Sequence, residues 1–204
     1  MPLFYHDSAE TSVEVLKVLY ESGIKAVEYT NRGDNALDNF TAMRKVVDDE
    51  MPGMHLGAGT IKTDADAELY VAAGADFIVC PVLNVEVGII VHKAGLLWIP
   101  GCMTMTEIIR AENLNAKLVK LFPGSLLGPS YVMVVKEIFP DLLVMPTGGV
   151  ELEKENLQAW FKSGVCAVGM GSKLISKFVL KNEDYNEITK LTTIALDFIK
   201  DIKK

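Results

Sequence analysis

A lysine within a short apolar segment is the residue of this 204-residue chain with the clearest chemical potential. The segment 117–123 reads KLVKLFP, and side-chain alternation along a β-strand places Leu118, Lys120 and Phe122 on one face. The other face should meet helices, so we expect Lys120 to point inward. Burial disfavours the charged form of a lysine, and an uncharged amine is what imine formation with a carbonyl needs. The alternatives are a lysine at an exposed edge or one paired with a core carboxylate.

A carboxylate and an arginine stand together in a second segment, 26–32, which reads AVEYTNR. The same alternation places Glu28 inward between the small side chains of Ala26 and Thr30. A carboxylate near a lysine acts either as its ion partner or as a general acid/base, and the spacing does not separate these roles. Arg32 falls just past the strand end, where it can pair with a carboxylate or phosphate. A solvent-exposed loop arginine is the commoner alternative.

Three glycine-rich segments follow other apolar runs: GAGT at 57–60, PTGG at 146–149 and GMGS at 169–172. In the first, glycines permit close backbone approach and the Thr60 hydroxyl can hold a ligand oxygen. The other two follow the last two apolar runs, where loops of a parallel barrel often present N–H groups to a phosphate. We therefore expect an anion site, with tight turns that bind nothing as the alternative. Its candidate residues are Thr147, Gly148, Gly149, Gly171 and Ser172.

The elements that must position these residues form a regular series. Eight short runs are mostly apolar and rich in Val, Leu and Ile, as is typical of strands buried on both faces. They cover 2–6, 26–30, 55–60, 77–81, 97–102, 118–123, 142–147 and 165–170. Strict alternation with helices implies parallel strands and right-handed crossovers. The fold class is therefore α/β, and eight units predict a (β/α)8 TIM barrel over one domain, 1–204, with an open doubly wound sheet as the alternative.

Helix-capping residues mark the segments between these runs. We expect helices that open near Ser8, Asp34, Asp64 and either Thr104 or Thr106. Gly23 and Gly74 are expected to close the first and third of these. Three more helices are expected over 129–139, 153–163 and 185–202, the last with an amphipathic stripe. In a parallel barrel the catalytic groups lie at the carboxyl ends of the strands, where the candidate residues fall.

Composition excludes several classes of protein. Lys and Arg number 20 against 27 Asp and Glu, a net charge of −7, so no nucleic-acid partner is expected. Half of the residues are hydrophobic, which excludes general disorder. No apolar run approaches the ~18 residues of a membrane span, and the start of the chain lacks the pattern of a secretory signal. The three cysteines lack CxxC spacing, and this favours a reducing, cytoplasmic location. The histidines have no metal-ligand spacing, so neither a metal nor a cofactor is expected.

Six motifs, taken in order, resemble those of the bacterial KDPG/KHG aldolases, which act on 2-keto-3-deoxy-6-phosphogluconate and 4-hydroxy-2-oxoglutarate. The motifs are VEYTNR at 27–32, GAGT at 57–60, FIVCP at 77–81, IPG at 99–101, VKLFP at 119–123 and PTGG at 146–149. The resemblance covers nearly the whole chain. It implies a class I, Schiff-base aldolase on a (β/α)8 barrel, usually a homotrimer, with a keto-acid phosphate as substrate.

The resemblance also implies individual roles. Lys120 corresponds to the imine-forming lysine and Glu28 to a general acid/base that works through water. Arg32 and Thr60 resemble the residues that hold the substrate carboxylate, and Pro81 and Phe122 resemble walls of the pyruvate pocket. Gly148, Gly149 and Ser172 look like the phosphate site. The chain departs from the family pattern at Cys80, Val82 and Lys173, the last standing where many relatives carry tryptophan.

Two other functions share these features. A phosphate-binding barrel isomerase or epimerase would use the same glycine loops without trapping pyruvate on a lysine. A non-catalytic protein that binds sugar-acid phosphates would hold ligand without turnover. An inward Lys120 together with Glu28 is the feature that favours the aldolase.

Overall fold

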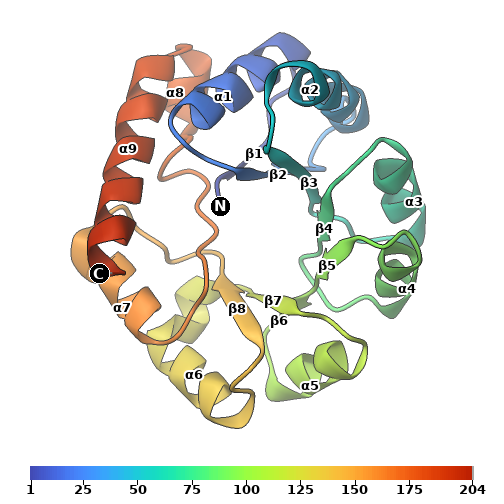
Figure 1. Ribbon diagram of the computed structural model, residues 1–204, viewed down its shortest axis with the longest axis vertical. Coiled ribbons are helices and arrows are strands. Elements are labelled where there is room, and N and C mark those ends of the chain that lie inside the picture. The colour runs from blue at the N-terminus through green and yellow to red at the C-terminus, as the bar shows by residue number, and fades with distance from the viewer. Residues whose placement is uncertain (204) are drawn as a thin grey trace.

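A ring of parallel strands surrounded by helices forms the computed structural model, which describes residues 1–203 (Figure 1). The strands are β1 Leu3–Phe4, β2 Ala26–Thr30, β3 His55–Gly59, β4 Phe77–Val79, β5 Leu97–Ile99, β6 Gly101–Cys102, β7 Leu118–Leu121 and β8 Leu143–Pro146. The helices are α1 Ala9–Glu21, α2 Ala36–Glu50, α3 Asp64–Ala72, α4 Val85–Lys93, α5 Met105–Asn113, α6 Gly124–Ile138, α7 Lys154–Lys162, α8 Lys177–Lys181 and α9 Tyr185–Ile202.

The expected strand over 97–102 divides at Pro100 into β5 and β6, and this division separates two hydrogen-bonded groups of strands. Their orders are β1-β2-β3-β4-β5 and β6-β7-β8. Proline has no N–H to donate, so the ladder toward β4 stops at this residue. The Pro100 carbonyl instead accepts a hydrogen bond from the Lys120 N–H at 2.9 Å. The segment 97–102 therefore pairs first with β4 and then with β7, and it connects the two groups of strands within one ring.

The segment 165–170, expected as the last strand, forms isolated bridges instead of a regular strand. Met170 bridges Pro2 and Gly169 bridges Thr147, both in parallel. The Cys166 N–H also donates to the carbonyl of Val144 at 3.1 Å. Because these bonds are single and divided between two neighbours, no continuous ladder forms. These bridges nevertheless link β8 to β1, so the ring of parallel strands and surrounding helices agrees with the expected (β/α)8 barrel.

The helix starts confirm some capping residues and correct others. Ser8 accepts from the Thr11 N–H, and Thr104 forms a full capping box with Glu107. The second helix is preceded by Asn35 instead of Asp34, without a side-chain cap, and the third by Thr63 instead of Asp64. Helix α6 starts at Gly124, ahead of the expected 129, and is kinked at Gly128, where φ is +72°. Helices α4 and α8 were given no bounds in advance, although each has a capping side chain: Asn84 accepts from the Glu86 and Val87 N–H groups, and Ser176 accepts from the Val179 N–H.

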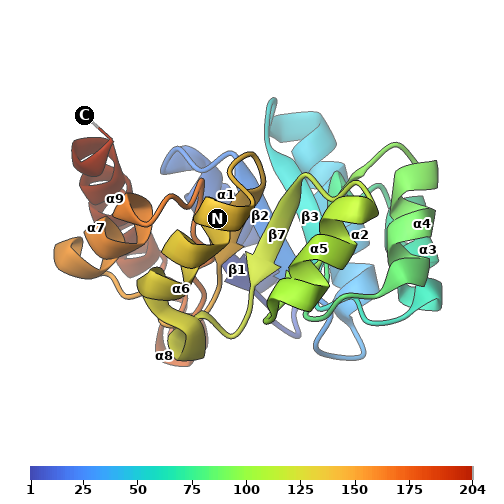
Figure 2. The same cartoon turned by 90° about the horizontal axis from the view of Figure 1, so that it is seen from below.

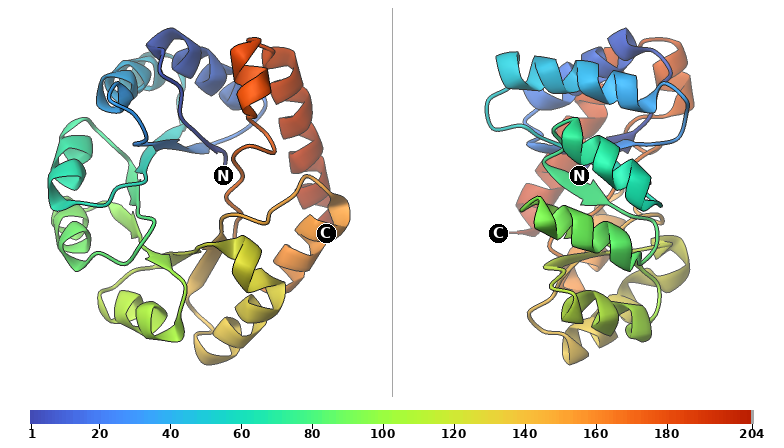
Figure 3. Two further views of the ribbon diagram at one scale, coloured as in Figure 1. Left: turned by 180° about the vertical axis from the view of Figure 1, so that it is seen from behind. Right: turned by 90° about the vertical axis from the view of Figure 1, so that its right-hand side faces the viewer.

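Apolar side chains fill both the space behind the strands and the interior of the ring. The inner cluster consists of Phe77, Val79, Ile99 and Met145. Seen from the side, α8 lies at one end of the barrel and the C-terminus at the other (Figure 2). The view from behind shows the chain leaving the ring for α8 and then α9 (Figure 3). Among the described residues no helix is long and apolar enough to cross a membrane.

Candidate active site

Lys120 and Glu28 form an ion pair inside the barrel, with 3.2 Å between Lys120 Nζ and Glu28 Oε1. Their side chains are 5% and 0% exposed, so solvent barely reaches either group. The alternation expected from the sequence holds, because Val119 and Leu121 pack in the core behind the strands while Lys120 points into the ring. β2 and β7 are not paired with each other, so the two side chains, 92 positions apart in the chain, meet across the interior of the ring.

Glycines of β3 make the room that the Glu28 side chain occupies. Gly57 pairs with Glu28 in the β2–β3 register, and Gly59 pairs with Thr30. A Cβ on Gly59 would lie 2.2 Å from Glu28 Oε1, so any larger residue would collide with the carboxylate. The second oxygen, Glu28 Oε2, is buried without a hydrogen-bond partner. A buried carboxylate oxygen left in this way can accept a proton or a hydrogen bond from a bound molecule.

Apolar groups surround the pair. The ring of Phe122 lies 5.5 Å from Lys120 Nζ and is part-exposed. Phe77, Val79 and Met145 occupy the inner cluster of the barrel. Pro81, just past the end of β4, packs its carbonyl against Gly101, and Gly101 pairs with Lys120 in the β6–β7 register. Electrostatic interactions are strong in such surroundings because little water screens them.

Arg32 and Thr60, two of the residues expected to hold a ligand, meet at the ends of β2 and β3. Arg32 Nε donates to Thr60 Oγ1 at 3.4 Å. Thr60 adopts φ +61°, an uncommon backbone conformation for a threonine, and such strain is concentrated at functional sites. The Tyr5 ring occupies the space where a Cβ on Gly33 would stand, so the first loop packs against the loop that carries Arg32. The arginine is exposed and has unused donors.

The PTGG loop after β8 packs against the start of α6. Gly148 and Gly149 have φ +87° and +70°, and a Cβ on Gly149 would lie 2.6 Å from the Cα of Ser125. The Gly124 N–H donates to the Thr147 carbonyl at 2.8 Å. Thr147 is buried and its Oγ1 has no hydrogen-bond partner. Ser125 was not among the residues expected from the sequence; its place at the first turn of a helix directly after the Lys120 strand was the signal available.

The second glycine-rich loop lies next to the first. The Thr147–Gly169 bridge joins their starting points, and the Thr147 side chain fills the space above Gly169. Gly171 lies beside Leu3 of β1, and Ser172 is exposed in the following turn. The structure thus brings the predicted anion-binding residues together on neighbouring strands. Lys120 pairs with Met145 of β8 in the register, two residues before Thr147, so the pair and the loops adjoin.

Other nucleophiles and metal ligands do not converge on this region. Burial raises the pKa of the Cys80 thiol to about 11 and that of Cys102 to about 12, so neither thiol is ionised near neutrality. All three cysteines are free. In residues 1–203 no group of three or more His, Cys, Asp or Glu side chains is arranged to hold a metal ion.

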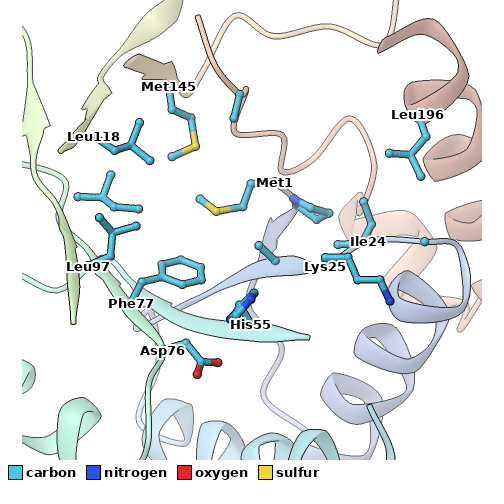
Figure 4. Close-up of a pocket in the computed structure, with 15 residues that line it drawn as sticks. Met1, Ile24, Lys25, His55, Asp76, Phe77, Leu97, Leu118, Met145 and Leu196 are labelled. Carbon is cyan, nitrogen blue, oxygen red and sulfur yellow. The ribbon is translucent and has the colours of Figure 1, made fainter. Parts of the chain in front are cut away.

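A separate cavity of about 590 Å³ opens at the other end of the barrel (Figure 4). Residues at the amino ends of strands line it, including Ala26, Phe77 and Leu118, with Lys25 and His55 also on its wall. None of the candidate site residues lines this cavity. It therefore lies beneath the inner apolar cluster and away from the Lys120–Glu28 pair.

Comparison with known proteins identifies similar chains. A family model described as KDPG and KHG aldolase matches residues 1–191. A 2-dehydro-3-deoxy-phosphogluconate aldolase of Treponema pallidum is 30% identical over 200 residues, 98% of this chain and 92% of that protein. A 2-dehydro-3-deoxy-6-phosphogalactonate aldolase of Escherichia coli is 35% identical over 123 residues, 58% of each chain. The KDPG aldolase from Legionella pneumophila, solved with pyruvate captured as a covalent carbinolamine intermediate, has a TM-score of 0.86 at 26% identity, covering 95% of this chain and 92% of that one.

Proposed function

The chain belongs to the KDPG and KHG aldolase family and is a carbon–carbon lyase of the Schiff-base class, and from this premise we propose that Lys120 forms the imine and Glu28 moves the proton. The substrate is a 2-keto-4-hydroxy acid. We propose 2-keto-3-deoxy-6-phosphogluconate, which would give pyruvate and glyceraldehyde 3-phosphate. 4-Hydroxy-2-oxoglutarate, which would give pyruvate and glyoxylate, is the second substrate of the same reaction. The buried Lys120–Glu28 pair at 3.2 Å is the observation that carries this proposal.

The first half of the reaction builds an electron sink. Lys120 Nζ attacks the C2 ketone, and loss of water from the carbinolamine gives a cationic imine. The partner carboxylate, Glu28, lies close enough to receive the proton that the ammonium must lose before it attacks. Because the pair is buried, bulk water has little access to the imine, and its premature hydrolysis is slowed.

The second half breaks the carbon–carbon bond. Glu28, acting through a water molecule, removes the proton of the C4 hydroxyl, and the C3–C4 electron pair moves into the imine to form an enamine. The aldehyde leaves, the enamine is protonated at C3, and hydrolysis returns pyruvate and free Lys120. Atoms balance without an added oxidant or reductant. The Lys120 iminium accepts the electron pair, and Glu28 and water transfer the protons.

The remaining candidate residues orient the two ends of the substrate. Arg32 and Thr60 are proposed to hold the carboxylate of the keto acid, because a guanidinium and a hydroxyl meet there. Pro81 and Phe122 are proposed as walls of the pyruvate pocket. The backbone N–H groups of the two glycine-rich loops, with Ser172, are proposed to bind the terminal phosphate. Thr147 is proposed to hydrogen-bond a ligand between these two ends, because its Oγ1 is buried and unpartnered.

We propose a homotrimer in the cytoplasm as the working form. Support for assembly comes from exposed apolar side chains on three consecutive helices of the ring, α4, α5 and α6: Ile89, Ile109, Met133, Val134 and Ile138. Three free cysteines fit a reducing compartment.

Turnover of synthetic substrates by the purified protein tests the proposed reaction. We expect stoichiometric pyruvate from 2-keto-3-deoxy-6-phosphogluconate and slower release from 4-hydroxy-2-oxoglutarate. Lys120→Met should abolish turnover of both substrates. Lys117→Met, which changes an exposed lysine directly before β7, should retain both activities. An isomerised substrate without pyruvate would identify an isomerase or epimerase, and binding without any product would identify a non-catalytic protein.

A further inference from the structure

An ion pair connects the two glycine-rich loops at the mouth of the barrel. Lys173 Nζ lies 2.6 Å from Glu151 Oε2. Lys173 directly follows Ser172, and Glu151 is two residues after Gly149. The pair therefore spans the two segments that the proposed function assigns to the substrate phosphate.

The glutamate side of this pair sits on a fixed loop. The Glu151 N–H donates to Asn156 Oδ1 at 2.9 Å, and Asn156 Nδ2 donates back to the Gly149 carbonyl at 3.2 Å. Trp160 Nε1 donates to the same carbonyl at 3.2 Å. Helix α7 thus holds the loop from behind, and its position does not depend on the ion pair.

The lysine side is free to change partner. The Lys173 side chain is 51% exposed and its backbone stands in a turn closed by the Leu174 and Ile175 N–H groups on the Gly171 carbonyl. A lysine ammonium is a point charge on a flexible stem, so it can exchange one anionic acceptor for another without backbone movement. Glu151 raises the pKa of Lys173, so the side chain is cationic at neutral pH.

Lys173 is also the one basic residue in either loop segment, 146–149 and 169–175. The chain has a net charge of −7, so a doubly charged phosphate gains no general attraction from the protein. Backbone N–H groups offer only partial charges, and a full positive charge must come from a side chain next to the loops.

We propose, on the basis of the proposed function, that Lys173 is a specificity-determining residue that binds the substrate phosphate and that Glu151 competes with the phosphate for it. The free enzyme holds Lys173 on Glu151; the phosphorylated substrate takes the lysine over. Lys173 then favours phosphorylated over unphosphorylated keto acids, and Glu151 limits that preference.

This role predicts opposite effects for the two partners, whereas a simple clamp between loops predicts the same effect for both. The measured quantity is the ratio of kcat/KM for 2-keto-3-deoxy-6-phosphogluconate to kcat/KM for its unphosphorylated analogue. We expect Lys173→Met to lower this ratio about tenfold, the size of one charge-assisted hydrogen bond, and Glu151→Gln to raise it about threefold. Inorganic phosphate, used as a competing anion, should inhibit Glu151→Gln more strongly and Lys173→Met more weakly than the unmodified enzyme. High salt should reduce all these differences.

Lys17→Met is the matched control, because it breaks another ion pair at the surface, Lys17–Glu50 at 3.0 Å, which joins α1 to the last residue of α2. Its ratio should equal that of the unmodified enzyme. A lowered ratio in both Lys173→Met and Glu151→Gln would overturn the proposal in favour of a clamp, and an unchanged ratio in Lys173→Met would overturn it outright. A ratio of one in the unmodified enzyme would instead refute the phosphate site of the proposed function, and this inference with it.

Discussion

At the residue scale, Lys120 and Glu28 depend on each other, because each is the ion partner that makes burial of the other tolerable. Taking either charge out of water alone is costly, and breaking such a pair typically costs about 3–5 kcal/mol. The same closeness allows proton exchange between the two groups. Structural pairing and catalysis are therefore not alternatives here, and a variant that keeps the shape of Glu28 is needed to separate them.

Glu28→Gln is that variant. It keeps the size of the side chain and removes the base, so we expect pyruvate still to form an imine with Lys120. Cleavage should fall about 10²- to 10⁴-fold, the usual contribution of a placed acid/base. Steady-state kinetics measures the second effect and borohydride trapping the first, with a circular-dichroism melt to confirm folding. Turnover close to that of the unmodified enzyme would reduce Glu28 to a structural ion partner.

Gly59→Ala tests the space that Glu28 occupies. An added Cβ would lie 2.2 Å from Glu28 Oε1, so the carboxylate must move away from Lys120. We expect kcat to fall by at least tenfold with little effect on secondary structure, because Gly59 has no positive φ to lose. Gly53→Ala is the control for activity: its Cβ would meet nothing within 4 Å, and its φ of +78° makes it a backbone-straining change away from the candidate site. Equal activity of the two variants would show that the position of Glu28 is not critical.

Sequence alternation predicted the direction of Lys120 and Glu28 because the strands are regular and buried on both faces. It could not show that the two side chains touch, since β2 and β7 are not paired and the contact is made across the interior of the closed ring. The contact between Gly59 and Glu28 is a product of the β2–β3 register.

At the element scale, the PTGG loop and the first turn of α6 form one unit. Gly149 packs on Ser125, and the Gly124 N–H bonds to Thr147. Helix α6 follows directly after the Lys120 strand, so a shift of this turn would move the phosphate loop relative to the lysine. If the loop binds the substrate phosphate as proposed, this packing would link phosphate binding to the position of C4.

Gly149→Val should break this link. A branched side chain there meets backbone at 2.6 Å and stands at φ +70°, which disfavours a β-branched residue. We expect it to erase most of the preference for phosphorylated substrate, lowering kcat as well as raising KM, while pyruvate trapping at Lys120 persists. The kinetic comparison with the unphosphorylated analogue measures both. Retained preference in a correctly folded variant would mean that these glycines serve only as turns.

The sequence predicted most elements but missed three details of the element arrangement. The expected helix from Pro129 matches only the part of α6 after the kink at Gly128, and the turn before the kink, 124–127, was not expected to be helical because Gly128 and Pro129 are residues that end helices. The division of 97–102 into β5 and β6 at Pro100 depends on tertiary hydrogen bonds: the Ile99 carbonyl accepts from Cys80, whereas the Pro100 carbonyl accepts from Lys120. The Lys173–Glu151 pair joins two loops whose proximity only the closed ring creates.

At the scale of the whole molecule, barrel closure divides the interior into functional layers. The Lys120–Glu28 pair stands toward the carboxyl ends of the strands, the inner apolar cluster lies below it, and the cavity opens at the far end. This arrangement agrees with the rule that barrel enzymes place chemistry at the carboxyl ends. The sequence predicted the eight-unit order because each unit is local, but not the short bridges that close it.

Assembly is the prediction at this scale. Sedimentation equilibrium should give three times the mass of one chain, because exposed apolar side chains on three consecutive helices favour assembly. Met133→Glu combined with Ile138→Lys on α6 should lower the measured mass, whereas Phe178→Glu, a change at an even more exposed apolar residue on α8, should not. A monomer in the unmodified protein would contradict the proposed trimer.

The central claim is that Lys120 carries the covalent intermediate, and peptide mass spectrometry after incubation with pyruvate and borohydride tests it most directly. The reaction should be run in EDTA, because Schiff-base chemistry at this site needs no metal ion. We expect one reduced pyruvyl group per chain, located at Lys120 and absent from Lys120→Met. Labelling confined to Lys117 or Lys173, or no label at all, would contradict it.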